Sequence, residues 1–428
     1  MKKIIMFLLT IFLSVFLFSC GSNNNNNNEY KPSLDTETKC KIKIVGSYDN
    51  FEALESEFDK FNKYYPNVQL SYEKLDDYNN NLSTVLEGNA KPNIFFSYTW
   101  MIGNEKYNSV VSHMEDIKNS PIKSNLDCIR PGLINNDENG KVLMIPVFSR
   151  TYGMLINNDL FKKYNINIPT TFNELKDVCN SFKNEGYTSP MMGYTEKSSS
   201  CLMNTIAYPL FVAALADNKE ALALANNKDP QAGEYMREAL NVVKELADNN
   251  NFNVTECDKI KDNYGKVILR FFEGDVPMMV CTGDTVSGTK KREAVSEAFK
   301  NSPFSYSFVP IPSTSKGGYF IDSPSIQFSV NKDCNDLEMT NEFMKFLISE
   351  KELNAMAAAK GLVSPTKNMP LDSIYAPFSN IPSNRTISPE VIGIKDPLTV
   401  QIRIASYKVG RGEISIDEAV QMYGSFKE

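Results

Sequence analysis

The chain has 428 residues, of which 42% are hydrophobic and 11% aromatic, enough apolar material for the cores of two or three domains. This composition excludes a disordered or fibrous protein. The formal net charge is −7, or −9 without Lys2 and Lys3, and the sequence contains no basic block. The charge pattern therefore argues against binding to nucleic acid or to anionic lipid.

The N-terminal end has the charge and hydropathy order of a secretory signal. Met1-Lys2-Lys3 precedes an apolar run over residues 4–18, which is too short to span a membrane comfortably. We therefore expect residues 1–19 to be a signal peptide that exports the chain. The six asparagines of residues 23–28 and the polar stretch after them cannot build a core, so residues 20–39 are predicted to be a flexible tether.

The sequence has eight cysteines, of which Cys20 lies directly after the predicted signal peptide. Leu17-Phe18-Ser19-Cys20 resembles the lipobox of bacterial lipoproteins, although Phe18 stands where a small residue is usual. The resemblance implies that Cys20 is lipidated and anchors the chain to the outer face of a bacterial cell membrane, in the periplasm or at the cell surface. The other seven form no C-x-x-C pair and are odd in number. Most of these thiols are predicted to be small buried hydrophobes.

Strands and helices alternate in the first part of the chain. Apolar residues recur with a period of two in the predicted strands and at helical spacing in the predicted helices. The alternation favours a mostly parallel α/β sheet whose ligand-binding loops follow the strands, here at residues 46–50 and 97–104. The predicted order is a strand at 41–45, a helix at 51–61, a strand at 68–72, a helix at 78–86 and a strand at 94–96.

The rest of the chain is richer in helices and has two capping boxes. Thr171 with Glu174, and Ser415 with Glu418, have the spacing at which the two side chains cap one helix N-terminus. Gly and Pro residues separate the predicted strands. The predicted strands are 152–156, 276–281, 307–309 and 326–330, and the predicted helices include 202–215, 231–247, 337–349, 351–360 and 416–426.

The motifs of catalysis and of nucleotide binding are missing. His113 is the only histidine, and the sequence has no G-x-S-x-G, H-E-x-x-H, P-loop or G-x-G-x-x-G pattern. We interpret His113 as a surface or hydrogen-bonding residue. Acidic pairs are common in this chain, but none has a spacing that distinguishes it from a solvated surface. The sequence predicts neither an enzyme nor a cofactor.

An ordered series of segments resembles family 1 extracellular solute-binding proteins of ABC importers, the group that includes sugar-binding proteins. The resemblance covers nearly the whole mature chain, and each motif alone is weak. Phe172 stands where the family has tryptophan, and Val276-Pro277 where it has paired alanines. The matching segments are residues 145–161, 168–175, 271–279, 309–312, 326–330, 343–347 and 361–365.

The resemblance implies a two-lobed periplasmic-binding-protein-like α/β fold of type II, with a hinge and a ligand cleft between the lobes. It places lobe 1 at about residues 40–149 plus 300–345, and lobe 2 at about 152–298 plus 348–428. A monomer is expected to capture a small solute, by default a carbohydrate, by lobe closure, because a ligand that contacts both lobes stabilises the closed form. The other implied partners are the permease subunits of an ABC importer.

The expected ligand contacts come from strand-end loops, from the first crossing between lobes and from the second lobe. Each has an alternative role: Trp100 as a wedge in the core, Arg150 in an interlobe salt bridge, and Tyr208 on a buried helix face. Asp49, Asn50 and Asp284 also suit helix capping. The candidate ligand-binding residues are Asp49, Asn50, Tyr98, Trp100, Arg150, Tyr208 and Asp284.

Two other functions stay open at this point. A lipid-anchored enzyme that acts on glycosides would need a matched pair of carboxylates. A surface adhesin with the same fold would need an exposed apolar patch.

Overall fold

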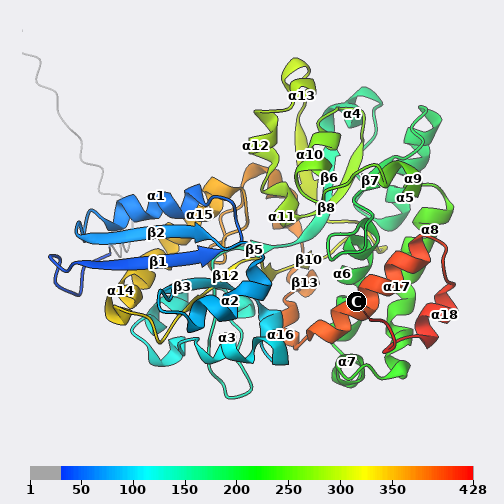
Figure 1. The fold of residues 1–428 in the computed structure, drawn as a ribbon. Helices are drawn as coiled ribbons and strands as arrows, with labels where there is room; N and C mark the ends of the chain where they lie inside the picture. The colour runs from blue at the N-terminus through cyan, green and yellow to red at the C-terminus, as the bar shows by residue number, and fades with distance from the viewer. Residues whose placement is uncertain (1–29, 428) are drawn as a thin grey trace, which may run out of the picture. The chain divides into compact units, whose positions relative to one another are not determined.

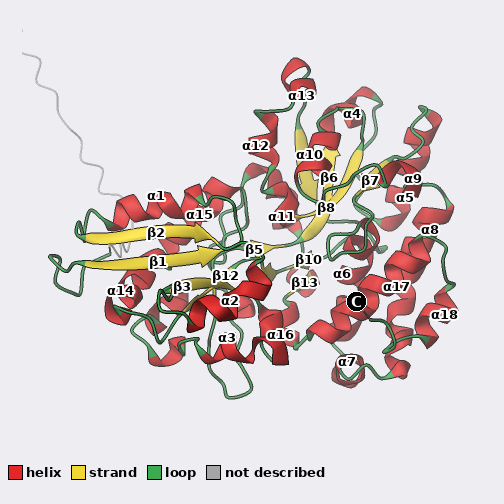
Figure 2. Cartoon of the chain, in the orientation of Figure 1, coloured by secondary structure: helices red, strands yellow, loops and turns green. Residues whose placement is uncertain are grey.

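The computed structural model describes residues 30–427, of which the part from Pro32 onward forms one compact unit. The predicted signal peptide, Cys20 and the asparagine run lie outside the described residues. Within the described part, no helix is both long enough and apolar enough to cross a membrane. The described chain folds around two separate sheets, each with its own helices (Figures 1 and 2).

Lobe 1 is built around a five-stranded sheet. Its elements are β1 (Cys40–Gly46), α1 (Glu52–Phe61), β2 (Val68–Lys74), α2 (Tyr78–Glu87), β3 (Ile94–Ser97), α3 (Asn108–Ser112), β4 (Ile145–Pro146), β12 (Gln327–Val330), α14 (Leu337–Leu347) and α15 (Glu350–Lys360). The strand order is β2-β1-β3-β12-β4, with β1 parallel to β2 and β3 and with β12 antiparallel to β3 and β4. The alternation in β1 buries Ile42 and Ile44 completely. α1 and α15 lie on one side of the sheet, and α2 and α3 on the other (Figure 1).

Lobe 2 has a four-stranded sheet of order β7-β8-β6-β9 and a larger set of helices. Its strands are β6 (Tyr152–Asn157), β7 (Met191–Gly193), β8 (Met278–Thr282) and β9 (Tyr306–Val309). Its helices are α4 (Asn158–Lys163), α5 (Phe172–Asn184), α6 (Leu202–Ala216), α7 (Lys219–Asn226), α8 (Arg237–Asp248), α9 (Val254–Cys257), α10 (Gly265–Phe271), α11 (Gly283–Val286), α12 (Thr289–Glu293), α13 (Glu297–Asn301), α16 (Pro389–Ile392), α17 (Asp396–Gly410) and α18 (Ile416–Gln421).

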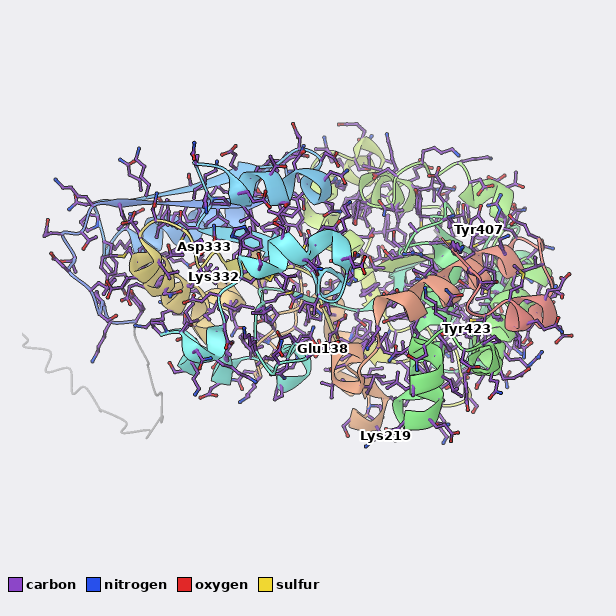
Figure 3. All side chains as sticks on the ribbon, turned by 60° about the horizontal axis from the view of Figure 1, so that its bottom comes forward. Glu138, Lys219, Lys332, Asp333, Tyr407 and Tyr423 are labelled. Carbon is purple, nitrogen blue, oxygen red and sulfur yellow. The ribbon has the colours of Figure 1, made fainter. Side chains whose placement is uncertain are left out.

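The core of lobe 2 lies between the sheet and helix α6. α6 contacts β6 and β8 and also packs against α8 and α17. Because it is covered on nearly all sides, it is apolar around most of its circumference rather than along one stripe. Tyr423, labelled in Figure 3, packs its ring against Phe211 of α6 and donates its hydroxyl proton to the carbonyl of Ala225 at 2.8 Å.

Three chain segments cross between the lobes, and Arg130 is bonded to all of them. β5 (Ser149–Arg150) pairs antiparallel with β11 (Ser323–Pro324), while the Ser149 N–H donates to Val363 of the third crossing at 2.9 Å. Arg130 donates to both carboxylate oxygens of Asp322 at 2.7 Å and to the Ser149 hydroxyl at 2.9 Å. It also donates to the carbonyls of Ser364 and Thr366, at 2.6 and 2.8 Å. β10 (Phe320–Ile321) and β13 (Thr386–Ile387) form a further short parallel pair.

Two predicted lobe assignments are wrong. β9 lies within residues 300–345, which were assigned to lobe 1, but it is hydrogen-bonded to β6 in the sheet of lobe 2. α15 lies within residues 348–428, which were assigned to lobe 2, but it packs on α1 of lobe 1. The reason is that the second crossing comes later than predicted, at β11, and the third comes after α15.

The predicted tether ends earlier than Lys39. The Ser33 N–H donates to Glu342 Oε1 at 2.8 Å, and the Leu34 N–H donates to the Tyr65 hydroxyl at 3.1 Å. Glu342 and Tyr65 belong to lobe 1, where both are buried. Residues 33 and 34 are thus fixed to the surface of lobe 1, and the flexible assignment is wrong for this stretch.

Both predicted capping boxes are confirmed, but two helices are shorter than predicted. The Glu174 N–H donates to Thr171 Oγ1 at 3.3 Å, and the matching bond from Glu418 to Ser415 measures 3.2 Å. The predicted helix 231–247 is a 3₁₀ segment (Pro230–Met236) followed by α8, because Gly233 approaches α18 so closely that an added Cβ would lie 2.1 Å from the Val420 carbonyl oxygen. The helix predicted at 416–426 stops at Gln421.

Candidate functional site

An ion pair between the crossings and lobe 2 stands at the centre of the candidate site. Arg150 Nη1 lies 3.0 Å from Asp284 Oδ2, with about a third of the arginine side chain and 17% of the aspartate side chain exposed. The Ser325 hydroxyl donates to the other carboxylate oxygen of Asp284. Burial alone would lower the pKa of Arg150, but the negative charge of Asp284 outweighs it, so the pKa is raised and the guanidinium stays charged.

Short strands and a strand end place these two residues. Arg150 pairs with Ser323 across β5 and β11, directly before β6 begins. Asp284 follows β8 in the first turn of α11, at the carboxyl end of a strand where ligands collect in α/β folds. The Gly283 N–H donates to the Thr151 carbonyl at 2.9 Å, which joins the start of α11 to the first crossing.

The charge of this ion pair acts on three tyrosines, which come from both lobes. Tyr48 and Tyr98 follow β1 and β3 of lobe 1, and Tyr264 precedes α10 of lobe 2 and is 50% exposed. The pKa of each hydroxyl is raised, chiefly by burial and further by the negative charge of Asp284. One carboxylate therefore acts electrostatically on aromatic side chains of both lobes.

Tyr98 is held by its neighbours in lobe 1. Its ring stacks on Trp100, with 5.4 Å between centroids and 7° between planes, and its hydroxyl lies 3.3 Å from that of Ser47. Trp100 contacts Tyr107 edge-on at 5.0 Å and is half-buried. Trp100 therefore stands between two tyrosines and fixes the plane of Tyr98.

Tyr208 lies behind the site rather than at its surface. Its ring is buried on α6 and packs against Tyr152 at 5.1 Å between centroids. Tyr152 is the first residue of β6 and pairs with Thr282 of β8. Tyr208 thus supports Tyr152, two residues from Arg150.

Asp49 and Asn50 are not brought together with the other predicted residues. The Asp49 carboxylate forms a salt bridge with Lys74 at 2.7 Å, and its side chain is 86% exposed. Asn50 is also exposed. Neither side chain caps α1, whose N-cap is Phe51. The assignment of Asp49 and Asn50 to a ligand site stays a prediction. Within the same loop, the residue whose hydroxyl pKa is raised by the charge of Asp284 is Tyr48.

Several buried polar atoms on the crossings, on α6 and on α16 have no partner among the described residues. Thr205, one helical turn before Tyr208, and Asn204 beside it each carry one such oxygen. Glu390 of α16 accepts from the Ser323 hydroxyl at 2.7 Å through one oxygen only, and burial raises its pKa to about 7. The full set is Arg150 Nε, Thr151 Oγ1, Asn204 Oδ1, Thr205 Oγ1 and Glu390 Oε2. Such atoms can bind the hydroxyl groups of a polar, uncharged ligand.

The described part of the chain contains no group of three metal-ligating side chains. The imidazole of His113 lies 2.8 Å from the carboxylate of Asp333, a residue of lobe 1 labelled in Figure 3. The expectation that His113 is a hydrogen-bonding residue is confirmed. The seven cysteines at positions 40 to 334 are all free thiols, and four of them are buried.

Sequence comparison relates the chain to proteins that bind solutes. The family model described as "Bacterial extracellular solute-binding protein" matches residues 57–381. The melibiose/raffinose/stachyose-binding protein MelE of Bacillus subtilis (strain 168) is 21% identical over 308 residues, which are 70% of this chain and 67% of that protein.

Solved structures share the fold at low sequence identity. The apo form of RafE from Streptococcus pneumoniae superposes with a TM-score of 0.69 at 16% identity, over 93% of this chain and 98% of that chain. The sugar-binding protein MalE from Xanthomonas citri gives a TM-score of 0.67 at 16% identity, over 90% of this chain and 96% of that chain. The described residues thus have the two-lobed α/β fold expected from the sequence.

Proposed function

We propose, from the premise that this chain belongs to the family of bacterial extracellular solute-binding proteins, that it captures an oligosaccharide between its lobes and delivers it to an ABC importer. Membership of that family makes the chain an exported binding protein and not an enzyme. The names of its relatives, which bind melibiose, raffinose and stachyose, support a sugar as the solute. The site residues support the same choice.

The observation that carries the proposal is the set of tyrosines around the Arg150–Asp284 pair. Aromatic faces bury the apolar C–H face of a sugar ring, while charged and amide groups bind its hydroxyls. Tyr98 and Tyr264 come from different lobes, and the charge of Asp284 raises the pKa of both hydroxyls. A sugar held between them would contact both lobes at once, and binding would then favour the closed form.

The crossings support a hinge at this position. β5 and β11 are only two residues long, so few backbone hydrogen bonds join the crossing segments. Arg130 fixes the three crossings to one another at the end of lobe 1. Lobe 2 would rotate about this fixed point when the solute binds.

The remaining parts of the proposal concern the anchor and the lobes. Cys20 is proposed to carry the lipid that holds the protein at the outer face of the membrane, where a permease can receive the solute. The protein is proposed to act as a monomer. Lobe 1 would comprise about residues 40–149 and 325–360, and lobe 2 about residues 152–319 and 367–427, as the strand pairing suggests.

Isothermal titration of the purified protein in mild detergent tests this function. The probes are raffinose, stachyose and maltotriose, with incubation of each mixture to check for turnover. Tyr98→Ala and Tyr264→Ala are each expected to weaken binding of the sugar that binds by about tenfold, because each removes one aromatic face. Asp49→Ala is the matched control, since Asp49 shares a loop with Tyr48 but bonds to Lys74.

Two outcomes would contradict the proposal. Absence of binding to every sugar of a broad neutral and acidic panel would refute sugar capture. Equal losses of affinity in the Asp49 and Tyr98 variants would show that the site lies elsewhere on lobe 1.

A further inference from the structure

Lys360 projects from lobe 1 beside one of the site tyrosines. It is the last residue of α15, and its Nζ lies 4.5 Å from the ring centroid of Tyr48 and 5.5 Å from that of Phe51. Among the described residues, no carboxylate is close enough to Lys360 to form a salt bridge. The cation is therefore held against aromatic faces next to the site without an anionic partner.

On lobe 2, Arg292 is a second cation without a carboxylate partner among the described residues. It belongs to α12, and a Cβ added to Gly265 would lie 3.0 Å from its Nη2. The guanidinium therefore lies against the start of α10, at the residue that follows the second site tyrosine, Tyr264. Neither Arg292 nor its neighbour Lys291 forms a salt bridge within the described part of the chain.

The chain segments that carry these cations touch one another. A Cβ added to Gly361, the residue after Lys360, would lie 3.9 Å from Ser287 Cα. Ser287 is two residues before α12. Burial lowers the pKa of Lys360, and the positive charges of Lys291 and Arg292 lower it further. Two cations of lobe 2 therefore act on the lobe 1 cation that lies against Tyr48.

The nearby carboxylates already have other partners or act on one cation only. Asp262 Oδ2 would lie 3.3 Å from the Cβ added to Gly265, and it accepts a hydrogen bond from the Lys266 N–H at 2.9 Å. Asp49 is bonded to Lys74, and Glu293 is bonded to Lys290 at 3.0 Å. Glu52 raises the pKa of Lys360, but burial and the two cations outweigh it. The like charges of Lys360, Lys291 and Arg292 repel one another. An arrangement of this kind is relieved when an anion binds between the charges.

We infer that the solute is an anionic oligosaccharide, whose acidic group binds between Lys360 of lobe 1 and Arg292 and Lys291 of lobe 2 while its rings lie on the tyrosines. The inference rests on the proposed function and narrows it from sugars in general to sugars that carry a carboxylate, sulfate or phosphate. The acidic group would also bring the lobes together, because each lobe supplies part of the positive charge.

Titration with trigalacturonate and with its fully methyl-esterified form tests the inference. The two probes share the same rings and differ only in charge. We expect the acid to bind at least about tenfold more tightly than the ester in 50 mM salt, and this advantage to shrink at 500 mM salt. Sulfated chondroitin disaccharides form a second arm that distinguishes sulfate from carboxylate as the preferred group.

Substitutions of Arg292 and Lys360 test whether these two cations cause the preference for the acid over the ester. Arg292→Gln and Lys360→Gln are each expected to reduce the affinity for the acid about tenfold and to leave the affinity for the ester unchanged. Lys290→Gln is the matched control on α12, because Lys290 is paired with Glu293, and it should change neither affinity. Thermal unfolding of each variant shows whether the variant is still folded. Arg292→Lys keeps the positive charge and so separates loss of charge from loss of the arginine side chain.

The failure of the inference differs from the failure of the proposed function. Binding of the ester or of neutral sugars that equals or exceeds binding of every anionic probe would overturn the inference and leave sugar capture intact. Affinity losses that are the same for acid and ester would also overturn it. No binding of any saccharide would refute both.

Discussion

Replacing Arg130 with methionine should destabilise the protein strongly, because this side chain is buried among three crossings. Its side chain is 15% exposed, and that of its partner Asp322 is 5% exposed. Removing the guanidinium leaves the Asp322 carboxylate buried without the two hydrogen bonds that Arg130 donates to it. It also leaves two carbonyls and the Ser149 hydroxyl without a donor. Breaking a buried pair in this way costs about 3–5 kcal/mol, so R130M should lower the free energy of unfolding by about 4 kcal/mol.

Urea denaturation followed by two probes measures this change. Trp100, the only tryptophan, reports on lobe 1 by fluorescence, while circular dichroism reports on the whole chain. D322N, which removes the opposite charge, serves as the second arm of a double-mutant cycle with R130M. The double variant should be less destabilised than the sum of the two single variants, by at least about 1.5 kcal/mol. Additive losses, or a loss below about 1 kcal/mol for R130M, would refute the argument that Arg130 holds the crossings.

Two further predictions concern the cores of the lobes. The pKa of Glu57 is raised to about 7, by burial first and by its neighbour Glu352 second, so the folded state favours the protonated acid. The free energy of unfolding should therefore fall as pH rises from 5 to 8, by up to roughly 3 kcal/mol from this group, and E57Q should flatten the dependence in urea titrations at each pH. G153A should lower the free energy of unfolding by about 2 kcal/mol or more, because the added Cβ would lie 2.6 Å from the Phe308 ring. G88A, whose Cβ would meet no atom closer than 3.4 Å, is the control, and equal losses in both variants would show that packing is not the cause.

The elements that the sequence predicted well are those whose periodicity reports burial directly. β1 alternates because one of its faces is buried, and α1 buries Phe58 and Phe61 against Phe343 of α14. The two capping boxes were predictable because the bonds involved join residues only three positions apart. Local patterns of this kind need no knowledge of the rest of the fold.

The lobe membership of β9 and α15 could not be predicted in the same way. Periodicity shows that Tyr306–Val309 is a strand, but not that its partner is β6, about 150 residues earlier in the chain. The choice depends on where the chain crosses between lobes. Those crossings are two-residue strands, too short to leave a pattern.

The site shows the same limit at the scale of single residues. The loop after β1 was predicted to contact the solute because ligands collect at strand ends. Within this loop, Tyr48 lies near Asp284, whereas the carboxylate of its neighbour Asp49 points to Lys74. The prediction chose Asp49 as the ligand contact because its side chain is polar. The direction of each side chain depends on backbone angles that the sequence does not reveal. Tyr264 had no signal at all, since it stands in a polar segment that matched no motif.

Two arginines differ in how many of their hydrogen-bond donors the fold has satisfied. All five N–H groups of Arg130 donate hydrogen bonds within the protein, so it has nothing left to offer a ligand. Arg150 makes one hydrogen bond, to Asp284, and its Nε has no partner although it is buried. A buried donor without a partner is costly unless something binds it, so Arg150 is the arginine that a solute would satisfy. Residue type alone ranks the two equally, and the difference lies in the donors that the fold has left unused.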